Sequence, residues 1–383
     1  MTTTTEISFL IGAGFSVEAG IPTRNEINSK LKDLQWEDFI IGSEATTYFL
    51  QKPDPNSHWV NVTERKFIQA LISFYNSFNN EFDYENFYDY CYKIHDGQKD
   101  LNFEVFFKKY QSDHPSLLDK QNALSISIRT IDYLVNDLLK FNSDLFSNNI
   151  IDKYYPFINL IKQLILKFDK VNIYSLNHDL LLEAIFQTEL DFDYSDGFEI
   201  NGSNYFIKTG GEQVRIKRFK NEFGKKICLY KLHGSIDHYI YNFSEPFEMV
   251  KIPKKLYAPD LHRETFINEQ WKVENCWTLY EPEFLSGTTS KILNYDKHPF
   301  YSNQFAHFKN SLKKSKFLIC IGYGLEDEKI NEFIKAELNK LLKVLVVKRT
   351  NKPLSFFKLP NVFHYGIDLG IADIEFEKVK KYL

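Results

Sequence analysis

The feature that most constrains the fold is a short apolar run that ends directly in glycine. Residues 7–11 read ISFLI, and Gly12, Ala13 and Gly14 follow at once. An apolar run of this length, bounded by glycine, is typical of a strand buried inside a parallel sheet. Glycines at the end of such a strand lack a Cβ, so the backbone amides there can approach a pyrophosphate. A tight turn without a ligand explains the pattern equally well.

The residues after this loop argue against a nicotinamide dehydrogenase. In the fingerprint of those enzymes a full helix follows the glycines and leads to a second strand with an acidic residue about 20 positions on. Here Gly20 and Pro22 follow almost at once, and glycine with proline just beyond it is a helix stop signal. Asp33 has about the right spacing but lies in a helical pattern. We therefore expect only one or two helical turns after the glycine loop.

Further strand-like runs return only in the second half of the chain. They are VNIYS (171–175), ICLYKL (227–232), KFLICIG (316–322) and KVLVV (343–347), with helical patterns between them. This alternation predicts a doubly wound, mainly parallel Rossmann-like sheet of the α/β class. Between about 25 and 168, apolar residues recur at three-to-four spacing, which predicts a large inserted helical module. The expected domains are 1–24 with 169–383 for the sheet and 25–168 for the module.

Composition narrows the function classes. The formal net charge of −4 over 383 residues provides no overall attraction to nucleic acid or to an anionic membrane, so we expect no direct nucleic-acid binding. No apolar run approaches the roughly 20 residues of a membrane-spanning helix, and the N-terminus lacks signal-peptide features, so we expect a cytoplasmic protein without membrane association. The four cysteines stand singly, which predicts neither disulfides nor a C-x-x-C zinc pair.

Three more loops follow predicted strands, and open α/β sheets bind ligands at the carboxyl ends of their strands. The loops are 175–179 (SLNHD), 233–235 (HGS) and 322–324 (GYG). Each has a structural alternative, because Asn177 or Asp179 can cap a helix, His233 can be a hydrogen-bonded core histidine, and glycines form turns. Four such loops on one sheet edge favour a ligand site over four separate structural roles.

The segments GAGFSVEAGIPTR, YSLNHDLLLEAIF, KLHGSI and IGYG, in this order, resemble the sirtuins (the silent-information-regulator family), in particular the bacterial sirtuin-like proteins of anti-phage defence. The resemblance covers roughly 5–25 and 170–350. The helical stretch between Arg24 and Val171 looks like the module that those defence proteins insert after the first strand. The resemblance implies NAD as substrate and a homo-oligomer, and it is greatest for the sirtuin subunit that pairs with a hexameric HerA-type ATPase.

The resemblance also assigns roles to residues of all four loops. The residues that would hold the pyrophosphate are Gly12, Ala13, Gly14 and Ser16. Those that would form the cofactor loop are Ala19, Gly20, Ile21, Pro22 and Arg24. Those that would hold the adenosine side are Gly322, Tyr323 and Gly324. Asn177 and Asp179 match the family's Asn-x-Asp pair near the nicotinamide and its ribose, and His233 matches the catalytic histidine.

The sequence departs from the family pattern in two places. Deacylases follow the proline with Asp-Phe-Arg, whereas this chain has Thr23 and Arg24, which leaves the assignment of Arg24 open. Deacylases also carry a zinc ribbon of two C-x-x-C pairs, whereas only Cys276 lies between the His-Gly motif and Cys320, so we expect no zinc. Residues 287–290 (GTTS) read like the family's Gly-Thr-Ser loop but rank lower, because no apolar strand precedes them.

The resemblance leads to the prediction of an NAD hydrolase that releases nicotinamide and ADP-ribose and depletes NAD as a defence effector. Water would be the nucleophile: Asn177 would orient the water or the ribose hydroxyls, Asp179 would stabilise positive charge, and His233 would accept a proton. We expect low activity in the isolated chain and activation by assembly. Two alternatives stay open, an NAD-dependent protein deacylase and a non-catalytic NAD sensor or scaffold.

Overall fold

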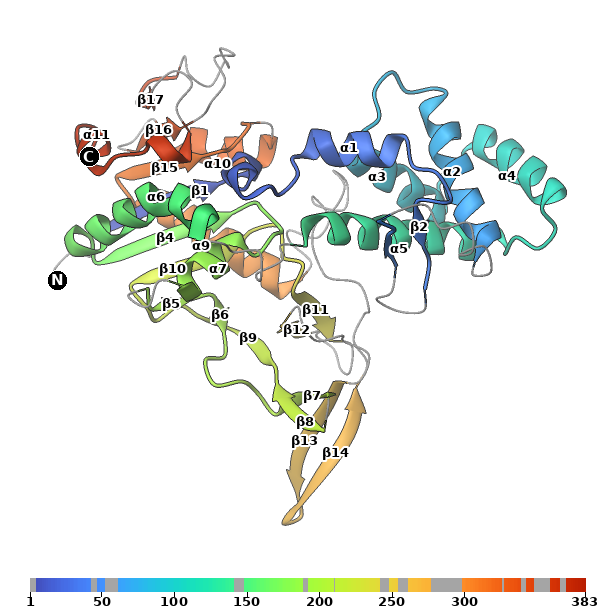
Figure 1. Ribbon diagram of the computed structural model, residues 1–383. Helices are drawn as coiled ribbons and strands as arrows, with labels where there is room; N and C mark the ends of the chain where they lie inside the picture. Colours follow the sequence, from blue (N-terminus) through green and yellow to red (C-terminus); the bar gives the residue numbers. More distant parts are fainter. Residues whose placement is uncertain are drawn as a thin grey trace.

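The structure is a computed structural model, and the residues that it describes are 5–42, 47–51, 61–140, 148–188, 192–209, 211–241, 248–253, 261–276, 298–325, 327–338, 342–347, 359–365 and 370–383. Its centre is a seven-stranded sheet in which every described pairing is parallel (Figure 1). The strands, in spatial order, are β17 (Val362–His364), β16 (Lys343–Val347), β15 (Phe317–Ile321), β1 (Glu6–Ile11), β4 (Lys170–Ser175), β10 (Ile227–Lys231) and β5 (Tyr194–Ser195). All five apolar runs of the sequence are strands of this sheet.

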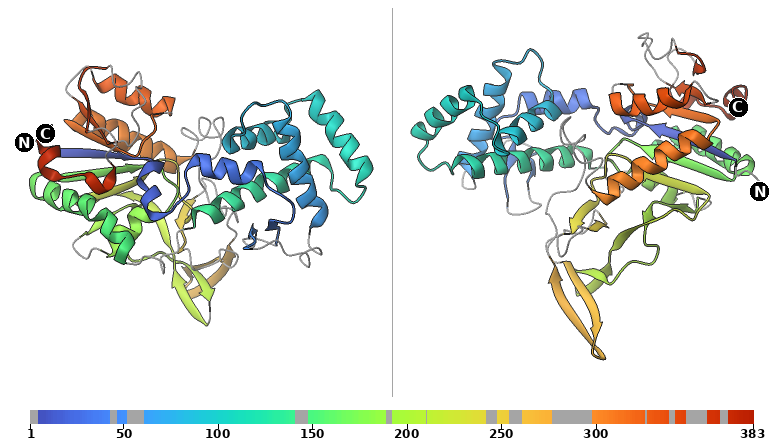
Figure 2. Two further views of the ribbon diagram at one scale, coloured as in Figure 1. Left: turned by 45° about the horizontal axis from the view of Figure 1, so that its top comes forward. Right: turned by 180° about the vertical axis from the view of Figure 1, so that it is seen from behind.

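Helices cover both faces of the sheet, which is why its strands are apolar along their whole length. In β1, Ile7 and Phe9 belong to one buried cluster and Leu10 to the other, so the strand serves two cores. The helices of the first core that pack against the sheet include α6 (Asn148–Lys167), α7 (Leu181–Thr188) and α11 (Phe376–Lys380). Those on the second are α9 (Pro299–Lys314) and α10 (Glu328–Leu338), and Figure 2 shows them from behind. The predicted doubly wound α/β fold is thereby confirmed.

A helical lobe lies beside the sheet and is built from residues between β1 and α6 (Figure 1). Its helices are α1 (Arg24–Lys32), α2 (Val62–Asn76), α3 (Tyr84–His95), α4 (Leu101–Asp113) and α5 (Lys120–Leu139). Helix α3 packs on α1 and α5, and α2 packs on α1 and α5. A two-stranded pair, β2 (Phe39–Ile40) with β3 (Tyr48–Phe49), also contacts α5. The predicted module extended to residue 168, but α6 contacts β4 and lies on the sheet, so we use the term helical lobe for α1 to α5.

Two small antiparallel sheets follow β4 in the sequence. The first contains β11 (His238–Tyr241), β12 (Glu248–Lys251), β9 (Lys217–Glu222) and β6 (Gly197–Phe198). The second contains β14 (Gln270–Cys276), β13 (Leu261–Ile267), β7 (Tyr205–Thr209) and β8 (Glu212–Arg215). The β13–β14 hairpin projects away from the rest of the molecule (Figures 1 and 2). None of the helices in the described ranges combines the length and the apolar character needed to cross a membrane.

Candidate functional site

The four loops singled out in the sequence meet at one edge of the central sheet. Ile11, the last residue of β1, pairs with Ile321 of β15 on one side and with Ser175 of β4 on the other. Ser175 in turn pairs with Lys231, the last residue of β10. The four strands therefore end at the same level. This edge is also where the strand order reverses, because β4 lies on one side of β1 and the later strand β15 on the other, and ligands bind at such points in open α/β sheets.

A cavity of about 680 Å³ opens at this edge, a size typical of small-molecule and cofactor sites. The predicted site residues that line it are Gly12, Ala13, Gly14, Ser16, Ile21, Pro22, Arg24, Asn177, Asp179, His233, Gly322, Tyr323 and Gly324. Ala19 and Gly20 are not among its lining residues. A smaller hollow of about 220 Å³ shares Gly14 and the GYG loop with the main cavity and adds Glu18 and Ile371.

The loop after β1 is compact, as expected from its early glycine and proline. It contains two single turns of 3-10 helix, η1 (Ala13–Phe15) and η2 (Val17–Ala19), and Gly20 closes the second turn in the left-handed conformation at φ +76°. Helix α1 starts four residues later, at Arg24. Thr23 caps it, and Glu26 Oε2 accepts a hydrogen bond from the Thr23 amide at 2.7 Å. The prediction of one or two turns in place of a full crossover helix is confirmed.

The glycines of the first loop permit close contact with the GYG loop of the same chain. The amide of Gly14 donates to the carbonyl of Gly322 at 2.9 Å, and the amide of Gly12 donates to that of Ile321 at 3.0 Å. A Cβ on Gly12 would lie 2.7 Å from the Gly322 oxygen. Gly322 itself has φ +63°, and a Cβ there would lie 2.2 Å from the amide nitrogen of Phe15. Both loops therefore require glycine for their mutual packing, whatever ligand they hold.

Asn177, Ser16 and Asp179 form a hydrogen-bonded chain on the floor of the cavity. The Asn177 amide Nδ2 donates to the Gly12 carbonyl at 3.1 Å and to Ser16 Oγ at 3.0 Å. Ser16 Oγ donates to Asp179 Oδ2 at 2.8 Å, while Asp179 Oδ1 accepts from the amide of Leu181 at 3.0 Å. Asp179 thus caps α7 and faces the cavity at the same time. Only 7% of Asn177 and 5% of Asp179 is exposed, so both polar groups are held in place.

His233 follows β10 and lies on the same floor, with 5% of the residue exposed. Its loop is tied to the SLNHD loop, because the amide of Ile236 donates to the carbonyl of His178 at 3.0 Å and Ser235 Oγ donates to it at 3.2 Å. The rings of His178 and His233 are 6.1 Å apart between centroids. His233 Nε2 also lies 3.3 Å from Oδ2 of Asp327, a cavity residue that the sequence analysis did not identify.

A buried ionic cluster supports this floor from below. The ammonium of Lys231 donates a hydrogen bond to the carbonyl of Asp179, and its Nζ lies 3.5 Å from Glu183 Oε1. Lys251 lies 3.5 Å from Asp237, which is next to His238. Burial raises the pKa of Glu183, although the two lysines oppose that rise. Burial disfavours the charged form of His238 as well, which for a histidine lowers the pKa, here to about 3, so this side chain is neutral near pH 7.

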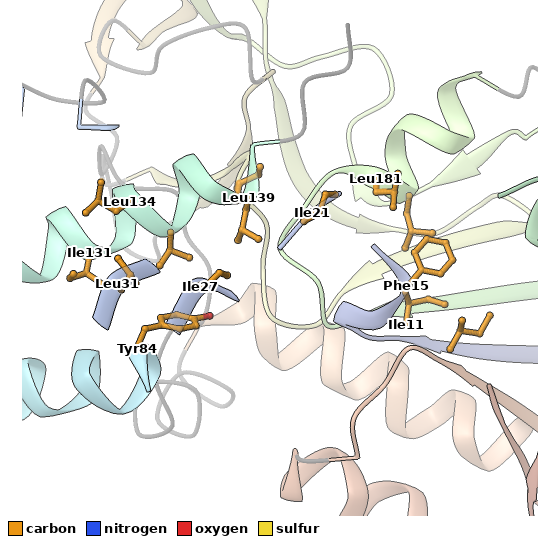
Figure 3. Close-up of a cluster of buried hydrophobic side chains, with 14 of the residues drawn as sticks. Ile11, Phe15, Ile21, Ile27, Leu31, Tyr84, Ile131, Leu134, Leu139 and Leu181 are labelled. Carbon is orange, nitrogen blue, oxygen red and sulfur yellow. The ribbon is translucent and has the colours of Figure 1, made fainter. Parts of the chain in front are cut away.

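The helical lobe forms a further wall of the cavity through Tyr84, Glu85 and Asn86 at the start of α3 and Leu139 at the end of α5. Figure 3 shows Tyr84 and Leu139 together with Ile27 of α1. No local sequence pattern predicted this wall, because α3 and α5 lie far along the chain from the glycine and histidine motifs.

Arg24, the first residue of α1, lines the cavity, and its charge is paired with carboxylates at the start of α3. Its guanidinium donates to both carboxylate oxygens of Asp83, at 2.8 and 2.9 Å, and lies 3.5 Å from Glu85. Burial alone would lower the pKa of Arg24, but the hydrogen bond to Asp83 and the charge of Glu85 raise it. The open assignment of Arg24 thus acquires a second interpretation, in which the residue joins the cofactor loop to α3.

Within the described ranges, no group of three or more His, Cys, Asp or Glu side chains is arranged to hold a metal ion. Residues 287–290, the lower-ranked GTTS segment, lie outside the described residues, so the structure does not place them.

The fold and the cavity define a parallel α/β protein with a ligand-sized site at the carboxyl edge of its sheet. No family model matches the sequence, and no curated protein matches it. Distant matches come from solved structures of Sir2 enzymes. One, from work on the mechanism and regulation of Sir2 enzymes, is 12% identical, covers 99% of this chain and 94% of its own, and has a TM-score of 0.38.

Two other matches are complexes. A Sir2 homologue bound to NAD is 10% identical, with 99% of this chain and 90% of that chain covered and a TM-score of 0.38. A mutant Sir2 homologue bound to ADP ribose is 9% identical, with 99% and 92% covered and a TM-score of 0.37. Likeness at this level carries no conclusion about activity, which has to be argued from the site.

Proposed function

We propose that this protein is an NAD hydrolase that cleaves NAD to nicotinamide and ADP-ribose. The observation that carries the proposal is the single cavity that joins the glycine loop, the Asn177–Asp179 pair and His233 above four adjacent strand ends. The order of the four motifs along the sequence also resembles that of the sirtuins.

The cavity offers a place for each part of the dinucleotide. The first turn of α1 lines it, and a helix N-terminus favours phosphate through its amides and its dipole. The smaller hollow beside the GYG loop would take the adenosine, which leaves the nicotinamide and its ribose over Asn177, Asp179 and His233. Because that floor is more than nine-tenths buried, bound substrate would be shielded from bulk water.

The chemistry requires little covalent machinery. The bond between the ribose and nicotinamide breaks, its electron pair leaves with the nicotinamide, and positive charge develops on the ribose as in glycoside hydrolysis. The carboxylate of Asp179 would stabilise that charge, and Asn177 would orient the attacking water or the ribose hydroxyls. As the water attacks, His233 would accept its proton.

We further propose that the activity serves anti-phage defence in the cytoplasm by depleting NAD. A hydrolase that was always active would deplete the NAD of its own cell, so the isolated chain should be nearly silent. Assembly into a homo-oligomer, or with a HerA-type ATPase, would activate it. This part of the proposal rests on the resemblance of the sequence motifs.

The test measures nicotinamide release from NAD by the purified protein, alone and with the product of a neighbouring ATPase gene, with and without an acyl-lysine peptide. Release without peptide should fall at least 100-fold in His233→Ala and in Asn177→Ala. His114→Ala, a histidine of the helical lobe outside the cavity, should behave as wild type. Release only with peptide would contradict hydrolysis and favour a deacylase, and tight NAD binding without turnover under any condition would favour a sensor.

A further inference from the structure

Asp327 caps α10 and at the same time faces His233. Its Oδ1 accepts a hydrogen bond from the amide of Ile330 at 3.0 Å, which satisfies the first turn of the helix. Its Oδ2 lies 3.3 Å from His233 Nε2. Capping needs only one side-chain oxygen, and serine or asparagine performs it as well as aspartate. The second oxygen therefore has no capping role, although the charge also interacts favourably with the N-terminus of α10.

The main chain around Asp327 is held by the GYG loop. The hydroxyl of Tyr323 shares its one hydrogen between two acceptors, the Asp327 carbonyl and Asn331 Oδ1, each at 3.1 Å. Asn331 Nδ2 donates in turn to the carbonyl of Leu325 at 2.9 Å, and Tyr323 and Asn331 are both buried. The loop that lines the adenosine side of the cavity thus determines where the carboxylate meets the histidine.

We propose that Asp327 is a positioning residue for His233, an inference that rests on the proposed NAD hydrolysis. A carboxylate opposite Nε2 favours the tautomer that carries its hydrogen on Nε2, and Nδ1 is then the ring atom that accepts a proton. During the reaction the attacking water transfers its proton to Nδ1, and the Nε2 hydrogen stays donated to Asp327. The carboxylate remains ionised and stabilises the imidazolium that forms.

Other titratable groups share the cavity and contribute to any pH dependence. They are Arg24 of α1, Tyr84 and Glu85 of α3, His178 and Asp179 of the SLNHD loop, Tyr323 of the GYG loop, and Glu328 and Lys329 at the start of α10. Lys231 lies two residues before His233, beneath the floor. Asp327 itself places a carboxylate oxygen 3.3 Å from His233 Nε2.

The decisive variant is Asp327→Asn, which keeps the size and the capping ability of the side chain but removes its charge. Glu332→Gln, an exposed position on the same helix and outside the cavity, is the matched control. In the activated protein, Asp327→Asn should lower kcat at least tenfold with less than a twofold change in KM. The acid limb of its pH–rate profile should move to lower pH, because the carboxylate that stabilises the imidazolium is gone. In a His233→Ala background the same substitution should have no further effect.

A second measurement does not depend on turnover. The protein is labelled with ¹⁵N-histidine, and the imidazole nitrogen NMR signals of His233 are assigned by their loss in His233→Gln. The spectra should show the Nε2–H tautomer of His233 in wild type and in Glu332→Gln. In Asp327→Asn they should show a mixture of the two tautomers. If the spectra show this change but no NAD turnover is found, the positioning contact stands and the hydrolase proposal fails. An unchanged tautomer in Asp327→Asn, or lower thermal stability with an unchanged pH profile, would overturn the positioning role.

Discussion

Gly322→Ala tests the contact between the two glycine loops. Gly322 has φ +63°, and a Cβ there would lie 2.2 Å from the Phe15 nitrogen and 2.5 Å from the Gly14 carbonyl carbon. Both neighbours are backbone atoms of η1, in the loop after β1, so no side chain can rotate to make room. The loops must separate, which lengthens the hydrogen bond from the Gly14 amide to the Gly322 carbonyl.

The magnitude has two parts. An alanine in the left-handed region costs about 1–2 kcal/mol. Insertion of a methyl group into a packed site adds about 1–3 kcal/mol. The free energy of unfolding should therefore fall by about 2–5 kcal/mol in Gly322→Ala. Gly97→Ala isolates the first part, because Gly97 has φ +98°, lies outside the cavity, and has no atom of the described residues within 4 Å of the point that a Cβ would occupy.

Urea denaturation followed by circular dichroism measures the stability of the two variants, and calorimetric titration measures their affinity for NAD. We expect Gly322→Ala to lose more stability than Gly97→Ala and to lose NAD binding, whereas Gly97→Ala binds as wild type. If both variants lost the same free energy of unfolding, the loop contact would be looser than the structure indicates. If Gly322→Ala bound NAD normally, the two loops would not form the dinucleotide site.

Two further predictions concern charges. Burial would raise the pKa of Asp83, but the hydrogen bond and the charge of Arg24, together with the hydrogen bonds from Asn86 and Asn28, outweigh burial and lower it. The stabilisation is therefore present above about pH 4 and is lost as the pH falls through the lower folded-state pKa. Urea titrations should therefore show Asp83→Asn to be less stable than wild type at pH 7, with the gap closing in acid, and a constant gap would contradict the ion pair. Burial lowers the pKa of His238 to about 3, so this side chain stays neutral in the folded state at higher pH. In the unfolded chain the same histidine takes up a proton below about pH 6.5. Between about pH 6.5 and pH 3 the free energy of unfolding should therefore fall by up to about 1.4 kcal/mol for each pH unit of acidification. The ring of His238 contacts Phe198 and Phe300, so phenylalanine is a fitting replacement. In the same titration, His238→Phe should show a smaller change of stability with pH, and an unchanged slope would mean that other groups cause the acid sensitivity.

Local sequence was sufficient to predict the five inner strands of the central sheet, though not its edge strands β5 and β17, and most of the loops that form the site floor. A strand with helices on both faces must be apolar throughout, so runs such as ISFLI can be recognised without knowledge of their neighbours. Parallel strands place their carboxyl ends at one edge, and the loops with Asn177, Asp179 and His233 were therefore expected to meet. The glycine and proline after the first loop likewise predict a short turn, because both residues act on the backbone where they stand.

Tertiary structure alone decided which distant groups meet across the cavity. An amphipathic helix reveals its apolar face but not the surface it covers, so α6 could not be assigned to the sheet, nor α3 and α5 to the cavity wall. The partners of Arg24 and His233 were hidden for the same reason: Asp83 and Asp327 both occupy helix-cap positions, where a carboxylate has an ordinary local explanation. Their second contacts exist only because the packed lobe and α10 bring them within hydrogen-bonding distance of residues from other loops.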